Sequence, residues 1–114
     1  MNLRRRVVTA ATTLGLAAFS MPVVADDSGA SIYIALCQAC HGADGVGVDR
    51  LGVTLAGSDF VQQRSIEELI AFLKAGRMPD DSDSVIGGVM PGFAYLSGDE
   101  LVTVAGYLKS TLQN

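Results

Sequence analysis

The chain has 114 residues, a length that fits one domain. Acidic side chains number 12 and basic ones 8, which gives a formal net charge of −4 at pH 7. This acidic balance excludes nucleic acid and anionic membrane surfaces as expected partners, since both attract basic proteins. With no Trp, 3 Tyr and 4 Phe, the chain also has little aromatic mass of its own for a core.

The N-terminal segment has the order of a signal peptide. Three arginines at positions 4–6 are followed by an uncharged, largely apolar run and then by the small residues 22–25. This order predicts export by general secretion and cleavage after Ala25. The chain therefore divides into a cleaved signal peptide, residues 1–25, and one mature domain, residues 26–114.

The alternative is that this segment remains as a membrane anchor, because the uncharged run 7–25 approaches the length that spans a bilayer. Pro22 and the small residues favour cleavage, and the run contains more Ala and Thr than Leu. We therefore expect a soluble periplasmic protein without membrane insertion. Loss of the three arginines makes its charge −7, which favours partner proteins with a basic docking surface.

Residues 28–40 predict the first helix of the mature domain. Their apolar side chains recur at intervals of three and four residues, at Ile32, Ala35, Leu36 and Ala39. This period places all of them on one helical face.

Cys37, Cys40 and His41 end this helix and form the most informative motif. A Cys-x-x-Cys-His run is the sequence signal for covalent attachment of a c-type haem. Two thiols three residues apart on a helical turn share one face, where each meets one vinyl group of the same porphyrin. His41 then projects toward the ring centre as the proximal iron ligand. We predict one haem c, with its iron, held by two thioethers.

Three other uses of Cys37 and Cys40 are a redox dithiol, half of a zinc site and a structural disulfide. A structural zinc site is disfavoured, because it needs four ligands and the chain contains only 2 Cys and 1 His. A redox dithiol does not require His41, and it usually lies at a strand-to-helix turn in a βαβ pattern that is absent here. The haem interpretation is preferred, since a buried porphyrin also supplies apolar mass to a small domain.

A loop and a second helix follow the motif. Residues 42–57 are predicted to form the loop, because the first six of them include three glycines. Ser65 and Glu68 form a capping box, and Gly76 is a stop signal. The apolar stripe between them is Ile66, Leu69, Ile70 and Leu73. This stripe predicts a core helix, part of which lines the haem.

A long loop, residues 77–96, precedes the last helix. It contains acidic residues and two Met-Pro pairs, Met78-Pro79 and Met90-Pro91. A connection of this length is usually functional or disordered.

The last helix is predicted from Gly98 to Leu112, after a second capping box formed by Ser97 and Glu100. Its inward face is Leu101, Val104, Ala105, Leu108 and Leu112. Gly106 weakens this helix slightly, which close packing against a neighbour would explain.

These elements together resemble the class I cytochrome c family. Gly29, Tyr33 and Cys37 follow one another at the four-residue spacing of the family's Gly, aromatic and first haem Cys, and Val104 with Tyr107 resembles the apolar and aromatic pair of its last helix. The resemblance implies a small all-α fold of three to four helices around one covalently attached haem. It also implies that the Gly permits close crossing by the last helix.

The resemblance also bears on the iron ligands. In the family a backbone carbonyl near a Pro-Leu pair orients the proximal His; this chain has Val53 and Thr54 before Leu55, and a carbonyl does not require Pro to accept the bond. A Met followed by Pro supplies the sixth ligand. Met90 is preferred over Met78, because it lies shortly before the last helix and is followed by Phe93, an aromatic that would cover the haem edge.

The function implied is that of a periplasmic one-electron carrier between a dehydrogenase or reductase and a terminal acceptor or oxidase. Iron with six ligands leaves no position for a substrate, so enzymatic chemistry is not expected. An alternative is a haem subunit of a larger redox enzyme, or a peroxidase-like centre with a displaceable distal ligand. A further alternative is a complex-bound subunit that acts as a fixed electron relay.

Overall fold

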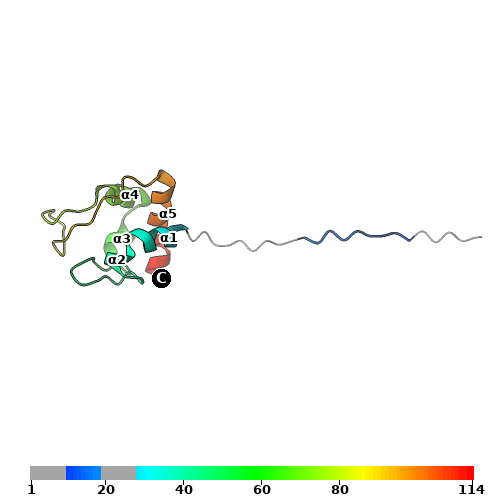
Figure 1. Cartoon of the computed structure of the whole chain (residues 1–114), viewed down its shortest axis with the longest axis horizontal. Helices are drawn as coiled ribbons and strands as arrows, with labels where there is room; N and C mark the ends of the chain where they lie inside the picture. The colour runs from blue at the N-terminus through cyan, green and yellow to red at the C-terminus, as the bar shows by residue number, and fades with distance from the viewer. Residues whose placement is uncertain (1–9, 19–27) are drawn as a thin grey trace, which may run out of the picture.

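The computed structural model describes residues 10–18 and 28–114. Within them there is no β-strand, only two isolated bridges, so the predicted all-α class is confirmed. The helices are α1 (Ser28–Leu36), α2 (Gln38–His41), α3 (Asp59–Gln63), α4 (Ile66–Ala75), α5 (Gly98–Lys109) and the 3-10 helix η1 (Thr111–Gln113), as Figure 1 shows.

The predicted signal peptide lies largely outside the described residues, which omit 1–9 and 19–27 and with them the cleavage site at Ala25. Its described part, residues 10–18, is exposed and has no regular secondary structure. Among the described residues, no helix is both long enough and apolar enough to cross a membrane. Cleavage between residues 25 and 26 therefore stays a prediction.

Helix α5 is the element against which the other helices pack. It contacts α1, α3 and α4. The predicted inward residues Leu101, Val104, Ala105 and Leu108 are buried, and so is Leu112 of η1. Burial of each Leu or Val side chain contributes about 1.5–3 kcal/mol relative to exposure. The core of the domain is therefore organised along the apolar face of α5.

Helices α1 and α5 cross at Gly29. A Cβ atom at this position would lie 2.8 Å from Tyr107 Cβ and 3.0 Å from the carbonyl oxygen of Thr103. The rings of Tyr33 and Tyr107 pack together beside it, with centroids 5.4 Å apart. The close crossing that the resemblance implies for Gly29 is present.

Both predicted capping boxes are also present. The Ser65 hydroxyl accepts from the amide of Glu68 at 3.1 Å, and the Glu68 carboxylate accepts from the Ser65 amide at 2.8 Å. Ser97 and Glu100 form the same pair of bonds at the start of α5. Gly76 ends α4 with a φ of 67°, a value that favours glycine.

The apolar face predicted for the first helix is wrong in part, because Ala35 and Ala39 are exposed, whereas the buried residues of α1 are Gly29 and Tyr33.

Three further details of the helices differ from the prediction. The first helix is divided at Cys37, whose φ of −116° departs from the helical value, although its amide still bonds to the Tyr33 carbonyl at 2.9 Å. The last helix ends at Lys109, and Leu112 belongs to the separate η1. The explanation of Gly106 by close packing is wrong, because nothing lies within 4 Å of a Cβ atom placed there.

Candidate haem-binding site

A largely apolar cavity of about 430 Å³ lies among the helices and the segment 77–90. Its volume falls within the range of about 300–1,000 Å³ that is usual for small-molecule sites. The lining residues come from distant parts of the sequence, and include Cys37, His41, Phe72 and Met90. The cavity therefore collects three of the four predicted haem residues, together with an aromatic side chain of α4.

His41 is held in one orientation by a backbone carbonyl. Its Nδ1 atom lies 2.7 Å from the carbonyl oxygen of Val53, and only 9% of its surface is exposed. Because a carbonyl oxygen only accepts hydrogen bonds, Nδ1 carries the proton of this bond. Nε2 of the neutral ring is then the nitrogen with a free lone pair, which is the arrangement of a metal-binding His.

Gly52 makes room for this bond, a role that its local sequence does not indicate. A Cβ atom at Gly52 would clash with the carbonyl group of Cys40 and would lie 3.1 Å from His41 Nδ1. Its φ is not positive, so the requirement comes from space and not from backbone conformation. Gly52 lets the loop pass close enough for Val53 to reach His41.

The two cysteines differ in their surroundings. Cys37 is 8% exposed and lines the cavity, whereas Cys40 is partly buried and is not among the lining residues. Neither is in a disulfide. Burial, with a smaller contribution from Cys40, raises the pKa of Cys37 to about 11. Redox dithiols need a lowered thiol pKa, so this environment disfavours that use of the pair.

A zinc site is also disfavoured. Within the part of the chain that the structure describes, no cluster of three His, Cys, Asp or Glu side chains could hold a metal ion. Zinc in structural sites takes four such ligands.

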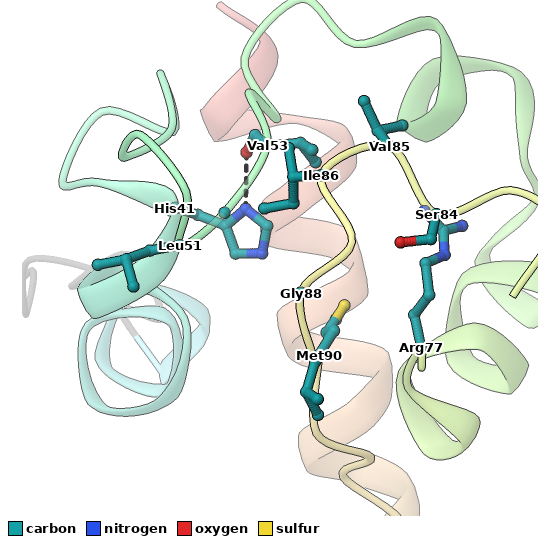
Figure 2. A pocket seen from close by; sticks show the side chains of 11 residues that line it. His41, Leu51, Val53, Arg77, Ser84, Val85, Ile86, Gly88 and Met90 are labelled. Atoms are coloured by element: carbon teal, nitrogen blue, oxygen red, sulfur yellow. Dashed lines mark hydrogen bonds between the residues drawn. The ribbon is translucent and has the colours of Figure 1, made fainter. Parts of the chain in front are cut away.

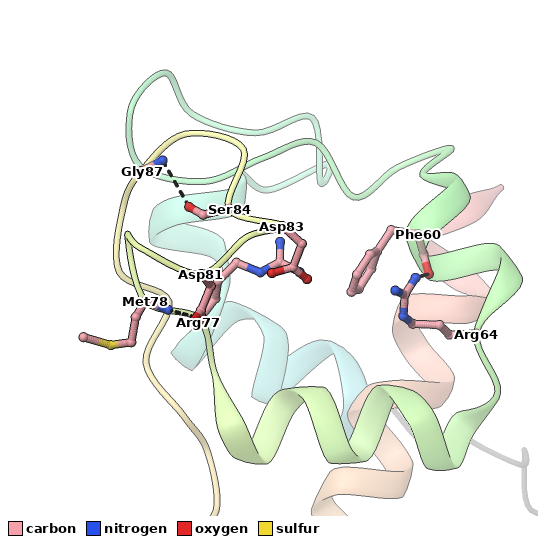
Figure 3. A network of polar contacts seen from close by, with 8 residues as sticks. All are labelled: Phe60, Arg64, Arg77, Met78, Asp81, Asp83, Ser84 and Gly87. Carbon is pink, nitrogen blue, oxygen red and sulfur yellow. Dashed lines mark hydrogen bonds and ion pairs between the residues drawn. The ribbon is translucent and has the colours of Figure 1, made fainter.

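The structure separates the two candidate methionines. Met90 is partly buried and lines the cavity, whereas Met78 is 55% exposed and is absent from its lining. Figure 3 shows the Met78 side chain pointing away from the loop. Phe93 does not cover the cavity as expected from the sequence, because it is buried in the core with 6% of its surface exposed.

A smaller pocket of about 60 Å³ shares five lining residues with the main cavity: His41, Val53, Arg77, Val85 and Met90. Figure 2 shows the His41 ring and the Met90 thioether, which approach this pocket from α2 and from the segment 85–90. The structure thus brings the predicted proximal and distal residues to one site from opposite parts of the chain.

The same cavity contains two arginines that the sequence analysis did not single out. Arg64 and Arg77 line it together with the rings of Phe60 and Phe72. The guanidinium carbon of Arg64 is 3.4 Å from the Phe60 centroid, and that of Arg77 is 4.7 Å from the Phe72 centroid. Arg77 also forms an ion pair with Asp83 at 2.7 Å. In Figure 3, the Phe60 ring lies between the two arginines.

Tyr33 connects α1 to the end of the haem motif. Its side chain is fully buried, and its hydroxyl donates to the carbonyl of Gly42 at 2.6 Å. Burial, with smaller contributions from Cys37 and other neighbours, raises the pKa of Tyr33 to about 12. The phenol therefore remains a neutral donor throughout the physiological pH range.

An all-α fold in which residues of a haem-attachment motif line an apolar cavity is typical of a c-type cytochrome. Comparison with protein families agrees: residues 24–108 match the family described as cytochrome C oxidase, cbb3-type, subunit III. The match covers most of the chain, and the chain belongs to this family. The predicted resemblance to class I cytochromes c is confirmed, and the chain is an electron-transfer haem protein of a family whose cofactor is haem c.

Individual proteins that are similar to the chain include a dehydrogenase subunit and a c-type cytochrome of known structure. The cytochrome c subunit of an alcohol dehydrogenase (quinone) from Gluconobacter oxydans (strain 621H) is 32% identical over 87 residues, which are 73% of this chain and 18% of that protein. The chain thus spans about a fifth of this relative's length. A solved structure, the KustC0563 c-type cytochrome, matches 75% of this chain and 98% of its own, with 19% identity and a TM-score of 0.54. At this identity it supports the fold alone.

Proposed function

We propose that the mature chain is a periplasmic one-electron carrier with a single haem c. Cys37 and Cys40 would hold the haem through thioethers, and His41 Nε2 and the Met90 sulfur would bind its iron. The haem, when bound, supplies the Fe(III)/Fe(II) couple through which an electron passes.

The residues of the chain support distinct parts of this role. The Val53 carbonyl fixes the His41 ring with Nε2 available to a metal. The apolar lining, which includes Phe72 and Leu73 of α4, would exclude water from the ring. Met90 offers a soft thioether donor, and Met with His ligation raises the reduction potential.

The observation that carries the proposal is the Nδ1 bond of His41 inside a cavity that Met90 also lines. A buried core His would satisfy its polar atoms without directing a lone pair into a cavity beside a thioether. Six ligands on the iron would leave little rearrangement on electron transfer, which favours a carrier over an enzyme.

A haem stain after denaturing electrophoresis tests the proposal. The protein would be exported in a host with haem-attachment machinery, beside the variants Cys37→Ala and Cys40→Ala. We expect a stained band at the mature size for the wild type and a weaker band for either variant, because each keeps one thioether position. Mature protein without covalent haem would contradict the proposal.

The acidic mature domain supports a redox partner with a basic docking surface, and the name of the Gluconobacter relative supports a dehydrogenase as electron donor. The acidic loop contributes less to docking than its sequence indicates, since two of its carboxylates have partners within the chain. Asp81 accepts from the Met78 amide at 2.7 Å, and Asp83 pairs with Arg77. All three carboxylates are exposed, and Asp80 is the one that forms no hydrogen bond or ion pair with the described residues.

Replacement of Asp80 by Asn tests this docking surface. We expect slower electron exchange with the partner at low salt, by less than tenfold, and no difference at high salt, where surface charges are screened. Glu67→Gln, at the start of α4, is a matched control with the same change of charge. Equal rates for Asp80→Asn and wild type at low salt would show that this loop does not dock.

A second candidate is a fixed electron relay inside a larger redox complex. It is favoured by the Gluconobacter relative, which is named as a subunit and of which the matched segment is only 18%. Cell fractionation and gel filtration distinguish the two. A monomer in the periplasmic fraction supports the free carrier, whereas co-elution with a dehydrogenase supports the relay.

A further inference from the structure

Arg77 occupies an unusual position in the candidate haem site. Its side chain is 14% exposed and lies against aromatic rings in a largely apolar cavity. A guanidinium in such a place needs anionic partners, because burial of a charge is costly unless it is paired. Within the described residues its only ion pair is with Asp83.

The hydrogen-bonding capacity of this guanidinium is largely unused. An Arg side chain has five N–H donors. Within the described residues, one hydrogen bond is formed, from Nη2 to the Asp83 carboxylate. Arg77 lines the cavity, where a planar carboxylate would find the fork geometry that a guanidinium provides.

Arg77 is also tied to Met90 through the backbone. The Arg77 amide donates to the Met90 carbonyl at 2.8 Å, and the Met90 amide donates to the Arg77 carbonyl at 2.8 Å. This antiparallel bridge closes the base of the loop between the two residues. One residue therefore holds the backbone of Met90 and places a cation in the cavity that Met90 lines.

Arg64 is a weaker candidate for the same role. It lines the cavity, but its Nη1 donates to the Phe60 carbonyl of its own segment at 3.0 Å, and its guanidinium lies on the Phe60 ring. The other charged or titratable groups that line the cavity are Cys37, His41, Arg77 and Asp83. Asp83 is an anion and His41 is fixed by Val53. Arg77 is thus the cation best placed to receive a carboxylate.

We propose that Arg77 binds a propionate carboxylate of the haem and, through its bridge to Met90 and its ion pair with Asp83, couples this contact to the placement of the distal methionine. This inference rests on the proposed haem function. Loss of the guanidinium would leave a haem carboxylate without its cation, which stabilises Fe(III) and lowers the reduction potential.

The test compares Arg77→Gln, Arg77→Lys and Arg64→Gln with the wild type, all as purified holoproteins. Arg64→Gln is the matched control, since it makes the same change in charge within the same cavity. Three quantities are measured: the propionate bending band in resonance Raman spectra, the reduction potential, and the rate at which imidazole displaces the distal ligand. The charge-transfer band of ferric iron bound to a methionine sulfur is recorded as a reference for ligation.

We expect Arg77→Gln to shift the propionate band, to lower the potential more than Arg64→Gln does, and to raise the imidazole rate several-fold. Arg77→Lys should restore the potential but not the propionate band, because it keeps the charge and loses the fork. Asp83→Asn should raise the imidazole rate without shifting the propionate band, because it loosens the loop and leaves Arg77 in the cavity.

A propionate band and potential in Arg77→Gln equal to those of the wild type would overturn the inference, as would shifts confined to Arg64→Gln. If Arg77→Gln retains no haem, Arg77→Lys decides: a wild-type propionate band in that variant overturns the inference, and a shifted band supports it. A wild type without covalent haem or without the sulfur band would instead contradict the proposed function. The two failures are therefore distinguishable.

Discussion

The two sides of the candidate haem site are built in different ways. On the proximal side, His41 is buried, its ring bonds to Val53, and its carbonyl accepts from the Gly47 amide at 2.7 Å. On the distal side, Met90 is partly buried and lies at the base of a loop closed by one backbone bridge. The proximal geometry is therefore fixed by burial and by hydrogen bonds to both the ring and the backbone of His41. The distal geometry depends on one backbone bridge between Arg77 and Met90.

This difference has a functional meaning. A rigid proximal side would keep the His41 nitrogen in place in both oxidation states of the proposed iron centre. A distal side held by few contacts opens at lower cost than the core, as is usual for loops with exposed hydrogen bonds. We therefore expect ligand exchange, where it occurs, to begin at Met90.

The largest effect on stability is expected from Gly52→Ala, which breaks the proximal side. The new methyl group would clash with the Cys40 carbonyl and crowd His41. We expect the free energy of unfolding to fall by about 3 kcal/mol, the upper end of the usual cost of overpacking. Chemical denaturation measures this loss. Gly98→Ala is the control, because nothing lies within 4 Å of a Cβ atom there, and an equal loss in both variants would contradict the account.

A smaller effect is expected from Tyr33→Phe, which removes the hydroxyl bond to Gly42 from the same side. The free energy of unfolding should fall by about 1–2 kcal/mol at neutral pH, since a partly buried carbonyl loses its donor. Tyr95→Phe, an exposed position, should be neutral.

The pH dependence of Tyr33 gives a second readout. Its pKa in the folded protein is about 12, above the ordinary value of 10, so the folded state favours the neutral phenol. The resulting stabilisation is fully present below about pH 10 and is lost as the pH rises through 12. The total loss of free energy of unfolding is about 2–3 kcal/mol. The wild type should lose this stability between pH 10 and 12, and Tyr33→Phe should not. The same loss in both proteins would show that another group is responsible.

The smallest effect is expected on the distal side, from Asp81→Asn. Its carboxylate accepts from the Met78 amide at an exposed turn, so the loss should be about 0.5–1 kcal/mol and local to the loop. Amide hydrogen exchange should become faster at Met78 and stay unchanged in α5. Asp80→Asn is the matched control, and a fall in protection across the whole domain would show that the loop is not a separate unit.

The local features of the fold were predictable from the sequence. The capping boxes at Ser65 and Ser97 mark the starts of α4 and α5, and the spacing of apolar residues gives the buried face of α5. The capping boxes act within one turn, so tertiary contacts do not change them. The apolar period was less reliable in α1, where Ala35 and Ala39 are exposed and the crossing with α5 buries Gly29 and Tyr33 instead.

The features that were missed depend on contacts between distant segments. Helix α3 has five residues, too few for an apolar period, and its Ser58 makes no side-chain cap. The need for Gly52 arises only where its loop meets Cys40. Phe93 follows Met90 closely, yet its amide bonds to the Leu73 carbonyl at 2.7 Å and its side chain enters the core.

The sequence predicted the haem-attachment residues of the candidate site, but not all of the side chains that surround them. The Cys-x-x-Cys-His motif consists of five consecutive residues, so it can be recognised without knowledge of the fold. Met78 and Met90 both precede Pro, and the sequence favoured Met90 by its place before the last helix and by Phe93, of which the second reason was wrong. The structure separates them because Arg77 pairs with Met90, which leaves Met78 on the exposed part of the loop. The cluster of Arg77 with Phe60 and Phe72 depends on three segments and has no signal in any one of them.

The central claim is that His41 and Met90 bind the iron of a covalent haem. The most direct test is the charge-transfer band of ferric iron bound to a methionine sulfur, compared between Met90→Ala and Met78→Ala. The account predicts that Met90→Ala loses this band, has a lower reduction potential and binds imidazole more readily, whereas Met78→Ala keeps the wild-type values. Retention of the band in Met90→Ala, or its loss in Met78→Ala, would contradict it.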